Sequence, residues 1–218
     1  QRVFEEITGH GFDGGYTAVK TYVRKVRPVP APEPSLPTEI PVPGQMAESD
    51  WSPFFIDFTS GQRTLVQVFS YVLRYSTRKY FGLYEHADIH ALMDGHVAAF
   101  ERFGGAAEIT KYDSQKAVVR AWEGDQPIYN PRFLAFATHY EFRPLACRRN
   151  HPNDKPRVER SFYEFEKSFL NGRRFHDPED MRAQLDHWLG AVADTRPYTK
   201  THRSRLELFE EERLQLRP

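Results

Sequence analysis

The sequence predicts a mixed α/β fold in which helices cover both faces of one sheet. Between residues 51 and 84, alternating apolar residues and β-branched or aromatic runs are separated by turn signals, which is typical of consecutive strands. After residue 88, apolar residues recur at helical spacing in several segments, and short strand-like segments separate them. Strands therefore come first along the chain, and helices alternate with further strands after them.

The first 27 residues are helical in pattern and basic toward their end. In "GYTAVKTYVRKV" (residues 15–26) one apolar stripe is spaced i, i+3, i+4, i+7, and Lys20 and Arg24 lie off it. We interpret residues 1–27 as a partial helix-turn-helix with Lys20 and Arg24 as DNA contacts; a plain amphipathic helix is the alternative. Residues 28–44 follow as a Pro-rich linker, because the seven prolines of "RPVPAPEPSLPTEIPVPG" exclude a helix or a central strand.

Three strands are expected at the start of the main domain. Phe54, Ile56 and Phe58 alternate with other residues, "TSGQ" forms a turn, and two further β-type runs flank "RYSTRK". A short strand at residues 106–112 ends at Asp113, and "EFRPLA" forms a fifth strand. The three consecutive strands are most simply an antiparallel meander.

Helices fill the intervals between and after these strands. The expected helices are residues 89–103, stopped by Gly104-Gly105; "NPRFLAFATHY"; the helix with Val158, Phe162, Phe165 and Phe169, stopped by Asn171-Gly172; and a last helix after the N-cap Asp177. The resulting order, βββ-α-β-α-β-α-α, is the ribonuclease H-like arrangement that recurs among two-metal nucleases and strand-transfer enzymes. We assign residues 45–176 to this core and 177–218 to a C-terminal helical extension.

The overall charge is balanced, but its distribution is not. The chain has 30 basic and 30 acidic residues, yet residues 143–160 hold six Lys or Arg against two acids, whereas residues 80–101 hold four acids and neither Lys nor Arg. Positive charge gathers around "NDKPRVERSFYEFEKSF" (residues 153–169), as a phosphate-binding face requires; a solvated surface is the alternative. The single Cys147 excludes a disulfide framework and a Cys-rich zinc site. With no long apolar run and no signal peptide, we expect a cytoplasmic protein.

Three carboxylates occupy positions that this topology can bring together. Asp50 heads the first predicted strand, Asp113 ends the fourth, and Glu159 begins a helix. Close carboxylates repel one another unless cations lie between them, and a pair of Mg²⁺ or Mn²⁺ ions relieves that cost. Each residue also has an ordinary interpretation: a solvated strand start, a cap, or a salt-bridged helix start. Asp57 is an alternative candidate on the first strand, but it alternates with Phe54, Ile56 and Phe58 and should therefore face the other side of the sheet.

Several motifs together resemble a known family. "PGQMAESDW", "LRYSTRKY", "EITKYDSQKAVV", "HPNDKPRVERSFYEFEKSFLNGRRF" and "LDHWLGAVADTRPYT" occur in this order. They resemble the IstA-type transposases of bacterial insertion sequences, in the superfamily of DDE transposases and retroviral integrases. The sequence departs from the usual family pattern at Glu48-Ser49, at Ser114 and at Lys155-Pro156-Arg157, but all three acidic positions are present.

The resemblance implies a function and a site. Asp50, Asp113 and Glu159 would be the DDE triad that binds two Mg²⁺ or Mn²⁺ ions, and Lys116, Lys155, Arg157 and Arg160 are candidates to bind phosphates. The family implies transposon-end cleavage, strand transfer into target DNA, multimeric assembly on paired ends and a companion AAA+ ATPase. It also implies that the chain is a fragment. A non-catalytic DNA-binding protein with a vestigial integrase fold, and a ribonuclease H-like nuclease without strand transfer, remain the alternatives.

Overall fold

The computed structural model describes the chain except residues 1–6, 9, 27–40, 114, 148–155 and 198–201, and for Arg24 and residues 156–159 it describes the backbone alone. The chain divides into two units, residues 1–40 and 41–218. In the first unit, helix α2 (Tyr16–Val26) coincides with the predicted amphipathic helix. The helix-turn-helix, the linker and the finer division at residues 27, 44 and 176 stay predictions.

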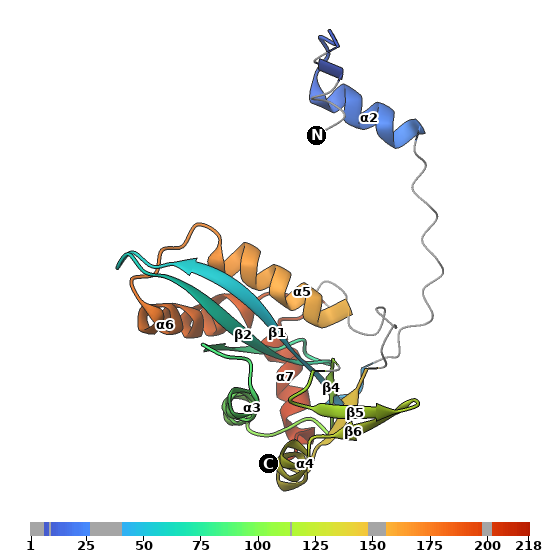
Figure 1. The fold of residues 1–218 in the computed structure, drawn as a ribbon, viewed down its shortest axis with the longest axis vertical. Helices are drawn as coiled ribbons and strands as arrows, with labels where there is room; N and C mark the ends of the chain where they lie inside the picture. Colours follow the sequence, from blue (N-terminus) through green and yellow to red (C-terminus); the bar gives the residue numbers. More distant parts are fainter. Residues whose placement is uncertain (1–6, 9, 27–40, 114, 148–155, 198–201) are drawn as a thin grey trace. The chain divides into compact units, whose positions relative to one another are not determined.

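The second unit is built on a five-stranded mixed sheet (Figure 1). Its strands are β1 (Met46–Asp57), β2 (Arg63–Leu73), β3 (Lys79–Tyr84), β4 (Ile109–Tyr112) and β7 (Arg143–Ala146), in the order β3-β2-β1-β4-β7. The first three strands pair antiparallel, whereas β4 runs parallel to both β1 and β7. The predicted meander is confirmed, and the fourth strand lies beside the first.

The predicted helices are also present. They are α3 (Ile89–Phe103), α4 (Pro131–His139), α5 (Pro156–Glu164) and α6 (Pro178–Trp188). Gly104 ends α3 at φ +73°, a left-handed conformation that glycine adopts without strain. Asp177 caps α6 by accepting a hydrogen bond from the Asp180 amide. Helix α5 continues as a π-helical segment, Phe165–Leu170, and ends before Gly172, as predicted.

Two predictions about the strands were wrong. Asp50 does not head the first strand, because β1 begins at Met46 and Asp50 is its fifth residue. The segment before Asp50 has few large apolar residues, but Ala47, Glu48 and Ser49 are buried because β2 and β4 flank this part of β1 on both sides. The predicted order also lacks a hairpin, β5 (Val119–Glu123) and β6 (Gln126–Tyr129), which turns at Gly124. A further helix, α7 (Arg205–Glu212), lies in the predicted helical extension.

Helices pack on both faces of the sheet, and alternate strand residues enter two separate cores. On one face, Phe69 and Tyr71 of β2 belong to a core that includes residues of α3, α4 and α7. On the other face, Val66 and Val68 of the same strand belong to a core that includes residues of the π-helical segment after α5 and of α6. The parity of a strand residue therefore tells which helices it faces.

Candidate active site

Asp50 lies on the face of the sheet that α5 covers. In the β1–β2 ladder it is paired with Ser70, and directly paired residues of an antiparallel ladder project to the same side. Ser70 Oγ is 3.1 Å from Ser161 Oγ on α5, and both serines are buried. Phe54 has the same parity as Asp50, and its ring centroid lies 5.3 Å from that of Phe165. Asp50 is half-buried, and its Oδ1 accepts a hydrogen bond from the Trp51 amide.

Asp113 directly follows the last residue of β4, the strand that pairs with β1 next to Asp50. The parallel β1–β4 ladder ends at the pair Ser49–Tyr112; Asp50 is the next residue of β1, and Asp113 is the first residue after β4. Tyr112 points to the α3 face, where its hydroxyl is 2.7 Å from Nε2 of His96. Alternation along β4 therefore assigns Asp113 to the opposite face, the one that Asp50 occupies. Asp113 is exposed.

Glu159 lies in the second turn of α5, two residues before Ser161. The Ser70–Ser161 contact places this part of α5 against β2, at the strand position paired with Asp50. Figure 1 shows α5 running along the β1–β2 ribbon. The side chain of Glu159 lies outside the described residues, so its role as the third carboxylate stays a prediction.

The two described carboxylates fit a hard divalent cation. Asp50 and Asp113 directly follow the last pair of the β1–β4 ladder, and neither is fully buried. Carboxylate oxygens are the ligands that Mg²⁺ and Mn²⁺ prefer. Within the part of the chain whose side chains are described, no three His, Cys, Asp or Glu residues gather in a metal-binding group; this part does not include the Glu159 side chain.

Asp57, the rival acid on β1, lies on the other face. Its parity is opposite to that of Asp50, its side chain is 73% exposed, and its Oδ1 lies 3.7 Å from Nε of Arg63. A solvent-exposed ion pair of this kind contributes about 0–1 kcal/mol and needs no metal. Asp57 is therefore a surface residue, and its exposure makes it a useful control for Asp50.

A partly buried ion network fixes the C-terminal end of α5. Glu164 accepts hydrogen bonds from Lys79 Nζ of β3 at 2.5 Å and from two nitrogens of Arg205 of α7, at 2.8 and 2.9 Å. Arg196 donates to the same carboxylate at 3.2 Å. Burial alone would raise the pKa of Glu164, but the hydrogen bonds from Arg205 and the charge of Lys79 outweigh it and lower this pKa to about 2. The helix that carries Glu159 is thus anchored to the sheet and to the C-terminal extension.

A second buried contact fixes the end of β4. His96 is fully buried on α3, and its Nδ1 lies 2.7 Å from the Leu92 carbonyl oxygen, which can only accept a hydrogen bond. The other ring nitrogen, Nε2, is then free to accept from the Tyr112 hydroxyl. Burial lowers the pKa of His96 to about 4, so the imidazole is neutral at pH 7. Tyr112 directly precedes Asp113, so this contact holds the strand end from which Asp113 projects.

The structure describes only some of the predicted DNA contacts. Lys116 is exposed three residues after Asp113, and Arg160 is exposed on α5 next to Glu159. Lys155 lies outside the described residues, and Arg157 is described only by its backbone in α5. In the first unit, Lys20 is exposed on α2, and Arg24 is described only by its backbone. The predicted phosphate contacts therefore stay predictions.

Sequence reasoning missed the residues that position α5. Nothing in the local sequence distinguishes Glu164 from the other acidic residues of a charged helix, because its partners Lys79 and Arg205 are 85 and 41 residues away. Ser70 and Ser161 carry no chemical signature in the sequence. Their small side chains could have indicated a close approach of helix and strand, but only the fold shows that they meet.

Comparisons with known proteins find transposases among the relatives of this chain. No protein-family model matches the chain. The chain is 29% identical over 218 residues to a putative transposase for insertion sequence element IS5376 of Geobacillus stearothermophilus, covering all of this chain and 54% of that protein. It is 30% identical to the transposase for insertion sequence element IS21 of Pseudomonas aeruginosa, covering 99% of this chain and 56% of that protein. The chain thus spans about half the length of these relatives.

Solved structures show the same fold at much lower identity. A chain of the simian T-cell lymphotropic virus intasome, solved with a PP2A regulatory subunit, matches 98% of this chain with a TM-score of 0.59 and 16% identity; the match covers 73% of that chain. The HTLV-2 integrase catalytic core domain in complex with magnesium matches 77% of this chain and 97% of its own, with a TM-score of 0.55 and 10% identity. The chain is therefore a homologue of the IS21-family transposases of bacterial insertion sequences, and it has the ribonuclease H-like fold of the retroviral integrase catalytic core.

Proposed function

We propose that the chain is the catalytic part of a DNA transposase, which cleaves a phosphodiester at the transposon end and joins the freed 3′-hydroxyl to target DNA. The observation that carries the proposal is the position of Asp50 and Asp113. They follow the last pair of the parallel β1–β4 ladder, on the face that α5 covers. In a homologue of transposases, that position suits a nuclease-type carboxylate site better than a solvated surface.

Asp50, Asp113 and Glu159 would hold two Mg²⁺ or Mn²⁺ ions. When bound, such ions activate an attacking oxygen and stabilise a leaving one. The protein supplies the rigid support: β1 and β4 set the spacing of the aspartates, and the Glu164 network holds α5. Lys116 and Arg160, both exposed near these acids, would bind the phosphates on either side of the reacting bond together with Lys155 and Arg157.

The proposed chemistry is balanced without any energy-rich cofactor. In the first step, a water oxygen forms a bond to phosphorus, and the 3′ oxygen of the transposon strand leaves as a hydroxyl. In the second step, this 3′ oxygen forms a bond to a phosphorus of the target strand, and the target's own 3′ oxygen leaves. One phosphodiester is broken for each one formed in the second step, so the transfer is close to neutral in energy.

The proposed partners are double-stranded DNA at the transposon ends and at the target, further copies of the chain, and a companion AAA+ ATPase. The names of the relatives, which are transposases of insertion sequences, support the DNA partner. The match to a chain of a viral intasome supports assembly into a multimer on DNA. The ATPase rests on the family resemblance alone. Within the described residues, no helix is long and apolar enough to cross a membrane.

Substitutions that remove one charge each, with a matched control on β1, test the proposal. We expect Asp50→Asn, Asp113→Asn and Glu159→Gln each to abolish end cleavage and strand transfer in Mg²⁺, because each keeps the side-chain size and removes the charge. Asp57→Asn, on the same strand with the opposite parity, should retain both activities. The assay uses a labelled transposon-end duplex, a target plasmid and the full-length protein of the element that encodes this chain. Melting temperature and DNA binding are measured for every variant.

Each outcome decides between the three candidate functions. Loss of both activities in the three variants, with DNA binding kept, supports the transposase. Cleavage without any joined product would identify a ribonuclease H-like nuclease. Equal activity of all four variants would refute this carboxylate site. Absence of metal-dependent cleavage by the wild-type protein would leave a non-catalytic DNA-binding protein.

A further inference from the structure

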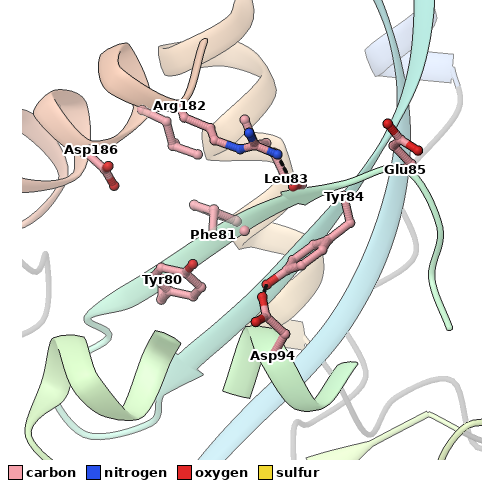
Figure 2. A pocket seen from close by; sticks show the side chains of 10 residues that line it. Tyr80, Phe81, Leu83, Tyr84, Glu85, Asp94, Arg182 and Asp186 are labelled. Carbon is pink, nitrogen blue, oxygen red and sulfur yellow. Dashed lines mark hydrogen bonds between the residues drawn. The ribbon is translucent and has the colours of Figure 1, made fainter. Parts of the chain in front are cut away.

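The outer edge of the sheet borders a cavity that the proposed chemistry does not use. The cavity has a volume of about 420 Å³ and is lined by six consecutive residues, 80–85, together with Asp94 of α3 and three residues of α6. Successive residues of a strand point to opposite faces of the sheet. Six in a row can line one cavity only if it runs along the edge of the strand rather than over one face. Figure 2 shows this arrangement, with α3 and α6 on either side of β3.

Main-chain N–H and C=O groups of the edge strand β3 face the cavity, where another strand could form hydrogen bonds with them. Among the described strands β3 pairs only with β2, so it is an edge strand of the sheet. The Arg182 guanidinium donates to the carbonyl oxygen of Leu83 at 3.4 Å, so this oxygen points outward into the cavity. Along an antiparallel strand, the main-chain N–H and C=O groups of successive residues point alternately to one neighbouring strand and to the other side. The groups of Phe81 therefore point outward like those of Leu83, whereas those of Gly82 point to β2.

A second cavity extends the same groove. It has a volume of about 240 Å³ and shares Leu83, Tyr84, Glu85 and Arg182 with the first. Its other walls come from the turn between β1 and β2, from the beginning of β2 and from the first turn of α6. The two cavities together follow the edge of the sheet from β3 onto the part of β2 that extends beyond β3. A groove of this length fits an extended segment of several residues better than a compact small molecule.

The side chains around the groove favour a basic ligand. Glu85, Asp94 and Asp186 surround it, against the single cation Arg182. Tyr80 also lines the groove, and burial together with the charges of Asp186 and Asp94 raises the pKa of its hydroxyl to about 12. Negative charge beside aromatic rings attracts lysine and arginine side chains, and it repels phosphate. The groove therefore does not suit the phosphate backbone of DNA.

We propose that β3 is a docking edge for an extended, lysine- or arginine-bearing segment of a partner protein, which adds to the sheet as a sixth strand. The main chain of the segment would pair with Phe81 and Leu83, and its basic side chains would reach Glu85, Asp94 and Asp186. Arg182 covers the Leu83 carbonyl in the free protein and would move aside. The groove shares no residue with the carboxylate site, so the proposal does not depend on the transposase function.

The probe is a blocked seven-residue peptide of alternating valine and lysine, titrated to millimolar concentration into the ¹⁵N-labelled chain. We expect the amide signals of Phe81 and Leu83 to shift and their hydrogen exchange to slow, while the Gly82 amide keeps its existing protection. A peptide with proline at its central position should bind at least about tenfold more weakly, because it lacks a main-chain donor and its ring blocks pairing. A valine–glutamate peptide should not bind.

Charge variants of the groove complete the test. Asp186→Asn and Glu85→Gln should each weaken the lysine peptide by about two- to fivefold, as expected for exposed ion pairs. Asp57→Asn removes the same charge from β1 and should leave affinity unchanged. Equal binding of the proline peptide would show side-chain attraction without strand addition and would overturn the proposal. So would shifts confined to residues outside the groove, or binding of a short DNA duplex in competition with the peptide.

Discussion

The partly buried ion network around Glu164 leads to a prediction: removing the anion should cost more stability than removing one of its cations. Glu164→Gln keeps the shape of the side chain and removes its charge, leaving Arg205 and Lys79 next to each other with side chains only 13% and 6% exposed. Lys79→Met instead removes one cation and leaves Glu164 paired with Arg205 and Arg196. The two substitutions break the same contact, yet we expect very different costs.

The pKa values indicate the size of the difference. A pKa of about 2 against the ordinary value of 4.5 means that the folded protein favours the Glu164 carboxylate by about 3 kcal/mol, at about 1.4 kcal/mol per pKa unit. Solvent reaches 15% of this side chain, so we expect Glu164→Gln to cost 2–3 kcal/mol, on the order of breaking a buried pair. Burial and the neighbouring Arg205 lower the pKa of Lys79 to about 8, so its ammonium is disfavoured in the fold. Lys79→Met should change stability by less than about 1 kcal/mol.

Urea unfolding followed by tryptophan fluorescence measures both costs, because all three tryptophans lie in the second unit. The sign of the pH dependence gives a further check. The Glu164 pKa is lowered on folding, so its contribution is complete above pH 4.5 and is lost as the pH falls toward 2. The difference between wild type and Glu164→Gln should shrink over that range. Equal destabilisation by the two substitutions at pH 7 would refute the reasoning.

Three further predictions concern other parts of the chain. The pKa of His96 is lowered from 6.5 to about 4, so we expect about 3 kcal/mol of stability to be lost as the pH falls between these values, and His96→Gln should flatten that dependence in urea titrations. Asp113→Asn should weaken Mn²⁺ binding by about tenfold or more in calorimetry without lowering the metal-free melting temperature; equal affinities would remove Asp113 from the site. In the intact protein, Lys20→Ala with Arg24→Ala should reduce the log–log salt slope of end binding by about two; an unchanged slope would exclude both as phosphate contacts.

Much of the fold could be predicted because its elements carry local signals. The apolar period of α3, the capping residue Asp177 and the glycines after α3 and α5 are all visible within a few residues. The same holds for the alternation of Phe54, Ile56 and Phe58, which shows which face of β1 is apolar. Each of these signals can be recognised from residues close together in the sequence, because helix caps, helix ends and apolar spacing depend on neighbouring residues.

The missed features depend on distant partners. Residues 46–49 form a strand because β2 and β4 flank them, and neither neighbour is visible from the sequence "MAES". The β5–β6 hairpin is short and mostly exposed, so it has little apolar alternation to reveal it. Its position depends on Tyr129, whose hydroxyl donates to the Pro144 carbonyl and accepts from the Ala146 amide of β7. The Glu164 network likewise joins residues from three parts of the chain.

The candidate site itself depends on parity as much as on residue type. Asp50 and Asp57 are both acidic residues on β1, seven positions apart, and an odd separation places their side chains on opposite faces. Only the face of Asp50 receives α5, through the contact of Ser70 with Ser161, and only at Asp50 does the pairing with β4 end. A carboxylate one residue earlier or later on β1 would face α3 and its closely packed aromatic core, where a cation could not reach it. The parity of β1 thus determines the face on which Asp50 lies, and the register between β1 and β4 determines that Asp113 follows the strand next to it. Both acids are common residue types, and only these positions distinguish them as a candidate site.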